Sequence, residues 1–246
     1  MDVKKISFGE YSFTIYGRPA SLQSSSNIKE QYKLKIKNEI KDCPNIFVRE
    51  IGVRIEWYTD FSERYEKDSS YDIDNIVKPT LDAMTGREGL FIDDCQVQNV
   101  ECFWVDKDPG SEDSLHIRVF SLEKNDDYVL EKDKVCFFQK DGPVYYLVPI
   151  ISKDGTRIFY KSCKDVFLSA EKLRSCFEDK NIGDEKAKKF EMCLLPMMAI
   201  KYHKTRINKS GFPYVEKEKI DEFIESLDAG DDEQKTVDVI KDKDEV

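Results

Sequence analysis

The segment Tyr71–Met84, YDIDNIVKPTLDAM, places an amphipathic helix directly after two aspartates. Its side chains fall on two faces, an apolar one with Ile76, Val77, Leu81, Ala83 and Met84 and a polar one with Asp74, Lys78 and Asp82. Such a helix has to bury its apolar face against another element. A proline is tolerated only near the start of a helix, so Pro79 predicts a helix that begins between Asn75 and Val77. Gly86 is predicted to end it.

Segments with alternating polar and apolar residues surround this helix and predict strands. They are Tyr11–Tyr16, Phe47–Tyr58, Val97–Val105 and Ser114–Leu122. A second amphipathic helix is predicted where Ile28, Tyr32, Ile36 and Ile40 recur at four-residue intervals, ending near Pro44. The order of strands and helices predicts a compact α+β layer.

The chain changes character after Leu122. Three apolar segments, KVCFFQ, VYYLVPII and TRIFYKS, are separated by Asp-Gly pairs and predict a β-meander with an aromatic core. Helices are predicted at Ser169–Asp179 with a Ser cap, around Pro196, and at Glu216–Leu227. We therefore expect a first domain at residues 1–122, an accessory meander and helical module at residues 123–230, and an acidic, disordered tail at residues 231–246.

Composition excludes several classes of protein. Seven cysteines without a CxxC pair and two histidines argue against a disulfide framework, a structural zinc site and a His-based triad. Without an apolar run of membrane-spanning length or a signal peptide, the protein is expected to be soluble and cytoplasmic. The formal net charge of −10 argues against nucleic-acid binding. The charge is unevenly distributed, however, and the segment KYHKTRINK forms a basic cluster.

A second acidic pair, Asp93 and Asp94, lies in the loop GLFIDDCQV before a predicted strand. The connecting chain is long enough to bring this pair back to Asp72 and Asp74 at the helix entrance. Gathered carboxylates repel one another, and a divalent cation removes that cost. Mg²⁺ suits such oxygen ligands, and Lys78 would supply positive charge for a phosphate.

The pattern DIDNIVK, then LDAMTG, then IDDCQV resembles the RusA-type family of Holliday junction resolvases. That family's hallmark is D-x-D-N-x-x-K, a helix, and a D-D-x-Q-V loop before a strand. FTIYGRPASLQ is similar to its opening strand and loop, so the resemblance covers about residues 6–122. The family is typically one small basic domain, whereas the matching half here is acidic and about 120 further residues follow.

The resemblance implies a RusA-like fold, a small mixed sheet with two packed helices. It also implies a Mg²⁺-dependent endonuclease, with Mn²⁺ as a substitute, that acts as a homodimer and nicks four-way DNA junctions. By position, Asp72, Asp74 and Asp94 match the metal-binding carboxylates and Lys78 the catalytic lysine. Asp93, Asn75 and Asp82 match accompanying motif positions.

Alternatives remain open for these residues. An Asp-x-Asp pair at a helix entrance can be a capping turn, and Lys78 with Asp82 can be a surface ion pair. The candidate DNA contacts can equally be solvated surface: Arg18, Lys201, Lys204, Arg206 and Lys209. A non-enzymatic protein that binds branched DNA or a partner, and a DxD-type nucleotide-sugar transferase, are the competing functions. The second module is expected to serve targeting, control or a protein partner.

Overall fold

The computed structural model describes residues 6–66, 72–122, 129–179 and 200–227. Contacts divide the chain into two compact units, Met1–Lys132 and Asp133–Val246, and each is described by itself. The predicted tail at residues 231–246 and the stretch around Pro196 lie outside the described residues. The predicted functional division of the chain stays a prediction.

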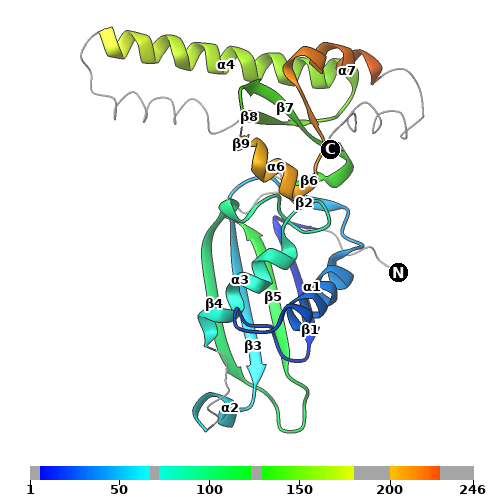
Figure 1. Ribbon diagram of the computed structural model, residues 1–246, viewed down its shortest axis with the longest axis vertical. Helices are drawn as coiled ribbons and strands as arrows, with labels where there is room; N and C mark the ends of the chain where they lie inside the picture. The colour runs from blue at the N-terminus through cyan, green and yellow to red at the C-terminus, as the bar shows by residue number, and fades with distance from the viewer. Residues whose placement is uncertain (1–5, 67–71, 123–128, 180–199, 228–246) are drawn as a thin grey trace. The chain divides into compact units, whose positions relative to one another are not determined.

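The first unit combines one four-stranded sheet, one two-stranded sheet and three helices in its described part (Figure 1). In chain order its elements are β1 (Glu10–Tyr16), α1 (Ser26–Ile40), β2 (Asn45–Phe47), β3 (Ile51–Thr59), α2 (Phe61–Tyr65), α3 (Ile73–Met84), the 3-10 turn η1 (Asp94–Gln96), β4 (Val97–Asp106), β5 (Ser114–Ser121) and β6 (Val129–Glu131). The large sheet has the order β1-β5-β3-β4, and β2 pairs with β6. The predicted α+β class is confirmed.

The large sheet is mixed: β4 runs parallel to β3, and β5 is antiparallel to both β1 and β3. Helices α1 and α3 lie on one face of it (Figure 1). The core between them contains buried side chains from every layer, among them Phe13, Ile36, Ile55, Ile76, Met84 and Ile117. Burying each such side chain contributes about 1.5–3 kcal/mol to the free energy of folding. Packing of Ile76 and Met84 in this core therefore holds α3 against the sheet.

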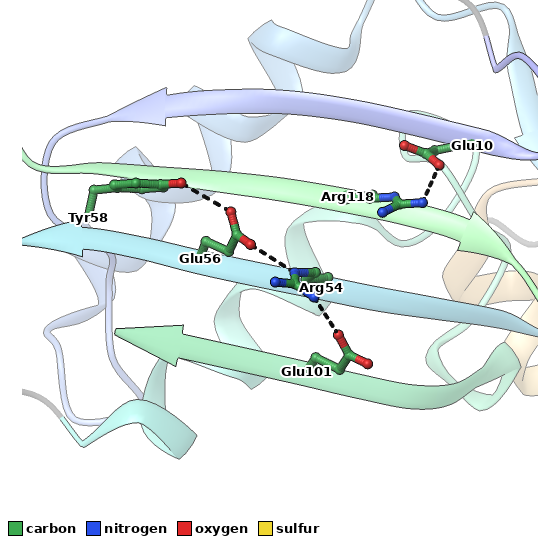
Figure 2. A network of polar contacts seen from close by, with 6 residues as sticks. All are labelled: Glu10, Arg54, Glu56, Tyr58, Glu101 and Arg118. Carbon is green, nitrogen blue, oxygen red and sulfur yellow. Dashed lines mark hydrogen bonds and ion pairs between the residues drawn. The ribbon is translucent and has the colours of Figure 1, made fainter. Parts of the chain in front are cut away.

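The opposite face of the sheet carries a polar network (Figure 2). Arg54 donates to Glu56 at 2.8 Å and to Glu101 at 3.2 Å, while Arg118 donates to Glu10 at 2.5 Å. Arg54 and Arg118 are directly opposite each other on β3 and β5. Their acidic partners therefore offset a like-charge contact that would otherwise weaken the strand pair.

The predicted strand Phe47–Tyr58 is wrong as one element, because the structure divides it into β2 and β3. The division lies at Val48, Arg49 and Glu50, which belong to neither strand. The carbonyls of Phe47 and Arg49 accept hydrogen bonds from the Gln96 side chain. Each half then pairs with different strands, β2 with β6 and β3 with β4 and β5.

The second unit contains its own small sheet of order β10-β7-β8-β9. Its elements are β7 (Val135–Asp141), β8 (Val144–Pro149), α4 (Lys153–Asp179), β9 (Lys201–His203), α6 (Lys204–Ser210), β10 (Tyr214–Val215), the 3-10 turn η3 (Lys217–Lys219) and α7 (Ile220–Ser226). The aromatic core predicted for the meander is confirmed: Phe137, Phe138, Tyr145 and Tyr146 are buried. The predicted helix Glu216–Leu227 is resolved into η3 and α7.

The third predicted strand of the meander, TRIFYKS, is wrong, since it belongs to the 27-residue helix α4. Ser152 begins this helix: its Oγ accepts from the amide of Gly155 at 3.1 Å, and its carbonyl accepts from the amide of Thr156. Thr156, Tyr160 and Cys163 are buried at helical spacing. Ser169 is therefore inside α4 and does not begin a separate helix. None of the helices described here is long and apolar enough to span a membrane.

Candidate active site

Helix α3 begins at Ile73, earlier than the predicted start between Asn75 and Val77, and it contains Pro79 in its interior. Proline has no amide hydrogen, so the Asn75 carbonyl loses its partner within the helix. The amide of Leu22 takes this place and donates to the Asn75 oxygen at 2.9 Å. This hydrogen bond connects the loop before α1 to the DIDNIVK motif at the start of α3.

Asp72 and Asp74 lie at the amino-terminal end of α3, and both are exposed. Asp72 occupies the N-cap position, but its side chain makes no capping hydrogen bond. In the described part of the chain, neither carboxylate is engaged in a hydrogen bond or ion pair. The capping interpretation of this pair is therefore wrong for Asp72, and the amides of the first helical turn favour negative charge here.

The chain returns along α3 through a tight turn after Met84. Gly86 has a φ of +91°, a left-handed conformation that favours glycine. A Cβ on Gly89 would lie 1.9 Å from the Met84 carbonyl oxygen, and the Leu90 amide donates to that same oxygen at 2.8 Å. This close return brings the second acidic pair back beside the helix, as the chain length allowed.

The two acids of the second pair have different places. Asp93 is buried, with 6 % of its surface exposed, and caps η1 by accepting from the Cys95 amide at 3.0 Å. The side chain of Asp94 keeps 40 % of its surface exposed and points to α3. Asp93 therefore shapes the turn, and Asp94 is the acid available to a ligand.

Lys78 joins the two motifs. Its Nζ lies 2.6 Å from Oδ1 of Asp82, one helical turn away, and 2.7 Å from Oδ2 of Asp94. The hydrogen bonds to Asp82 and then to Asp94 raise the pKa of Lys78, so the amine stays protonated at neutral pH. Asp74 is four residues before Lys78 on the same helix, which places their Cβ atoms about 6 Å apart. Lys78 thus forms the surface ion pair with Asp82 and also links the DIDNIVK motif to the IDDCQV motif.

The predicted magnesium ligands, Asp72, Asp74 and Asp94, fit the ion in donor chemistry, because all supply carboxylate oxygens. Asp72 and Asp74 have no side-chain partner among the residues that the structure describes. They are not gathered in advance: among the described residues, no group of three or more His, Cys, Asp or Glu side chains is arranged to hold a metal ion. The metal site and the roles of these residues stay predictions.

The predicted DNA-contacting residues differ in their surroundings. Arg18 forms an ion pair at 3.3 Å with Asp113, which also binds Lys107 at 2.6 Å. In the second unit, Lys204 pairs with Glu216 at 2.9 Å and lies over the Tyr214 ring. The other three predicted contacts are exposed: Lys201, Arg206 and Lys209. A role in DNA binding remains a prediction for all five.

Sequence reasoning missed what Gln96 does. Its Oε1 accepts from the amides of Ile92 at 2.7 Å and Asp93 at 3.0 Å, and its Nε2 donates to the carbonyls of Phe47 at 3.0 Å and Arg49 at 2.9 Å. The sequence does show this glutamine, within the D-D-x-Q-V pattern. Its partners, two carbonyls almost 50 residues earlier in the chain, follow from no local pattern.

Comparison with known proteins agrees with this arrangement. The family model described as Endodeoxyribonuclease RusA matches residues 19–119, which include both acidic motifs, Lys78 and the strands of the large sheet except β1 and the last residues of β5. No curated protein matches the chain. Residues beyond 119, including the whole second unit, lie outside the family match. Residues 19–119, less than half of the chain, are therefore similar to the RusA endodeoxyribonuclease family.

Proposed function

We propose that the first unit is a Mg²⁺-dependent, structure-specific DNA endonuclease of the Holliday junction resolvase type. It hydrolyses phosphodiesters at branched DNA as a homodimer, and Mn²⁺ substitutes for Mg²⁺. The observation that carries this proposal is the 2.7 Å contact between Lys78 and Asp94, because it joins the two acidic motifs of a domain similar to the RusA family. The match to a nuclease family gives no support to the nucleotide-sugar transferase alternative.

Three acids would hold the metal ion: Asp72, Asp74 and Asp94. A bound Mg²⁺ would polarise the phosphate and lower the pKa of a bound water. Asp72 and Asp74 enter from the start of α3, whereas Asp94 enters from η1. An ion held by all three acids would therefore bridge the start of α3 and the η1 turn.

Lys78 would bind the substrate phosphate. Its amine is protonated at neutral pH, and its side chain keeps 48 % of its surface exposed between Asp82 and Asp94. When the Lys78 ammonium is released from Asp94, it lies on the same face of α3 as Asp74. A fixed positive charge at this place stabilises the negative charge that develops on phosphate during hydrolysis.

The homodimer and the second unit extend the same proposal. A two-fold dimer would place two active sites on a branched DNA with approximate two-fold symmetry, so that two strands are cut. The second unit, with its exposed Lys201, Arg206 and Lys209, would serve as an accessory module for DNA or a protein partner.

The test uses the full chain with Mg²⁺ or Mn²⁺ and a panel of four-way junctions, flaps and linear duplexes. Cleavage of branched substrates by the wild type, lost in Asp74→Asn, supports the proposal. Asp108→Asn is the matched control, because this exposed acid lies in the β4–β5 connection outside both motifs. The proposal fails if no substrate is cut, or if Asp74→Asn cuts as fast as Asp108→Asn.

A second candidate function is binding of branched DNA without cleavage. The observation that favours it is that the described residues hold no ready-made carboxylate group for a metal ion. Tight binding of a four-way junction, with no turnover in Mg²⁺ or Mn²⁺ at any concentration tried, would support this function over the nuclease.

A further inference from the structure

The η1 turn that presents Asp94 leads directly into β4 and contains one buried side chain, Gln96, which is 5 % exposed. Its side-chain amide forms four hydrogen bonds, two as acceptor from Ile92 and Asp93 and two as donor to the carbonyls of Phe47 and Arg49. A glutamine amide offers one oxygen with two lone pairs and one nitrogen with two hydrogens. All four sites are therefore satisfied, and the amide has one orientation that fits.

These bonds connect the Asp94 turn to the backbone that leads from β2 into β3. Phe47 belongs to β2, which is anchored by pairing with β6, and Arg49 lies just before β3. The turn itself is a single 3-10 turn of three residues, in which the Gln96 amide donates to the Asp93 carbonyl and the Val97 amide to the Asp94 carbonyl. The bond from the Cys95 amide to the Asp93 side chain acts within the turn and does not reach β2 or β3.

Lys78 and Gln96 both act on the position of the Asp94 carboxylate, in different ways. Lys78 fixes the side chain through an exposed ion pair, which has to open when Lys78 turns to a phosphate. Gln96 fixes the backbone through buried bonds that a ligand does not disturb. Outer partners that orient a metal ligand typically contribute about ten- to a hundred-fold to metal affinity.

We propose that Gln96 is a positioning residue that sets the metal affinity of the site by holding the Asp94 turn against the sheet. This inference rests on the proposed function, since it takes Asp94 to be a metal ligand. Gln96 touches neither metal nor substrate. It acts by reducing the number of positions that the Asp94 carboxylate samples before an ion binds, so its loss costs affinity more than the rate of the saturated enzyme.

The test compares variants of the full chain. Gln96→Met keeps the length of the side chain and removes its four hydrogen bonds, and Gln96→Glu keeps the shape but turns an acceptor towards the Phe47 and Arg49 carbonyls. Gln98→Met is the matched control, because Gln98 is exposed and makes one long bond of 3.4 Å, to the Cys95 carbonyl. Ile117→Val, a core substitution in β5, controls for general destabilisation.

Three measurements are made on each variant: hydrogen exchange of the peptide spanning residues 90–97, Mn²⁺ affinity by calorimetry, and cleavage of a four-way junction against Mg²⁺ concentration. We expect faster exchange in both Gln96 variants and about a ten-fold weaker Mn²⁺ affinity. The Mg²⁺ concentration for half-maximal cleavage rises by the same factor, and the rate at saturating Mg²⁺ stays within about three-fold of wild type. The two control variants keep wild-type affinity.

Unchanged Mn²⁺ affinity in a folded Gln96 variant, together with its loss in Asp94→Asn, would overturn the inference and leave the proposed function intact. A wild type that neither binds Mn²⁺ nor cuts DNA would overturn both. If Gln96→Met does not fold, Asp93→Ala provides the second variant, because it removes the Cys95 bond of the same turn. A smaller loss of Mn²⁺ affinity is then expected, and no loss counts against the inference.

Discussion

Replacing Lys78 by methionine should change metal binding and cleavage in opposite directions. The substitution keeps most of the side chain's apolar length and removes its charge, leaving Asp82 and Asp94 without their shared partner. A metal ion that binds Asp94 in the wild type has to displace this ammonium. In Lys78→Met it does not, so the ion should bind more tightly although the catalyst is damaged.

The size of each effect can be estimated from exposure. The side chains of Lys78 and Asp94 keep 48 % and 40 % of their surface exposed, so their ion pair is well screened. Such a pair contributes about 0.2–1 kcal/mol, and losing it as a competitor should raise Mn²⁺ affinity by up to about five-fold. Cleavage should fall by about a hundred- to a thousand-fold, the usual cost of removing one group that stabilises a transition-state charge.

The assay pairs calorimetric titration of Mn²⁺ with single-turnover cleavage of a four-way junction at saturating Mn²⁺. Lys37→Met is the matched control: Lys37 pairs with Glu88 in the same unit, so the variant loses the same charge outside both motifs. It should keep wild-type cleavage and affinity. A Lys78→Met protein that binds Mn²⁺ more weakly than the wild type, or that cuts at the wild-type rate, would refute the reasoning.

Three further predictions follow from the surroundings of single side chains. Asp93→Ala should lower the free energy of unfolding by about 1 kcal/mol in urea, because it removes a cap, and should keep most cleavage at saturating Mg²⁺. Asp94→Ala should lose cleavage by more than about a hundred-fold, and equal losses in the two variants would contradict their assignment. Cys95 is exposed, whereas three other cysteines of the described chain are buried, so N-ethylmaleimide should modify Cys95 before those three and slow cleavage. Cys95→Ser should resist this inhibition, and an inhibition that persists would place the sensitive thiol elsewhere. Asp113→Asn should lower the calorimetric melting temperature more than Glu88→Gln, because the Asp113 side chain is 10 % exposed and that of Glu88 is 73 % exposed. A larger effect for Glu88→Gln would contradict the expectation that the ion pairs of the buried Asp113 with Arg18 and Lys107 matter more for stability.

The sequence predicted the parts of the site that depend on local periodicity. The apolar face of α3, its polar face with Lys78, and the strands on either side follow from repeats that a single segment contains. The approach of Asp94 to this helix was expected from chain length and from the family resemblance. The contact between Lys78 and Asp94 confirms the approach to the helix, and leaves the joint binding of a metal ion as a prediction.

The parts that the sequence did not predict depend on contacts between distant segments. An interior proline was expected to limit the start of α3, but the Leu22 amide uses the carbonyl that Pro79 leaves free. The pair Asp154-Gly155 was interpreted as a turn between strands. In the structure it lies in the first turn of α4, which the Ser152 side chain caps. The bonds of Gln96 to Phe47 and Arg49 have the same character, since a side chain pairs with backbone far along the chain.

Calorimetric titration of Mn²⁺ into the full chain tests most directly whether carboxylates from two separate segments hold one ion. We predict one binding event that is weakened at least ten-fold in each of Asp72→Asn, Asp74→Asn and Asp94→Asn, and unchanged in Asp108→Asn. Absence of binding by the wild type, or wild-type affinity in Asp94→Asn, would contradict the account.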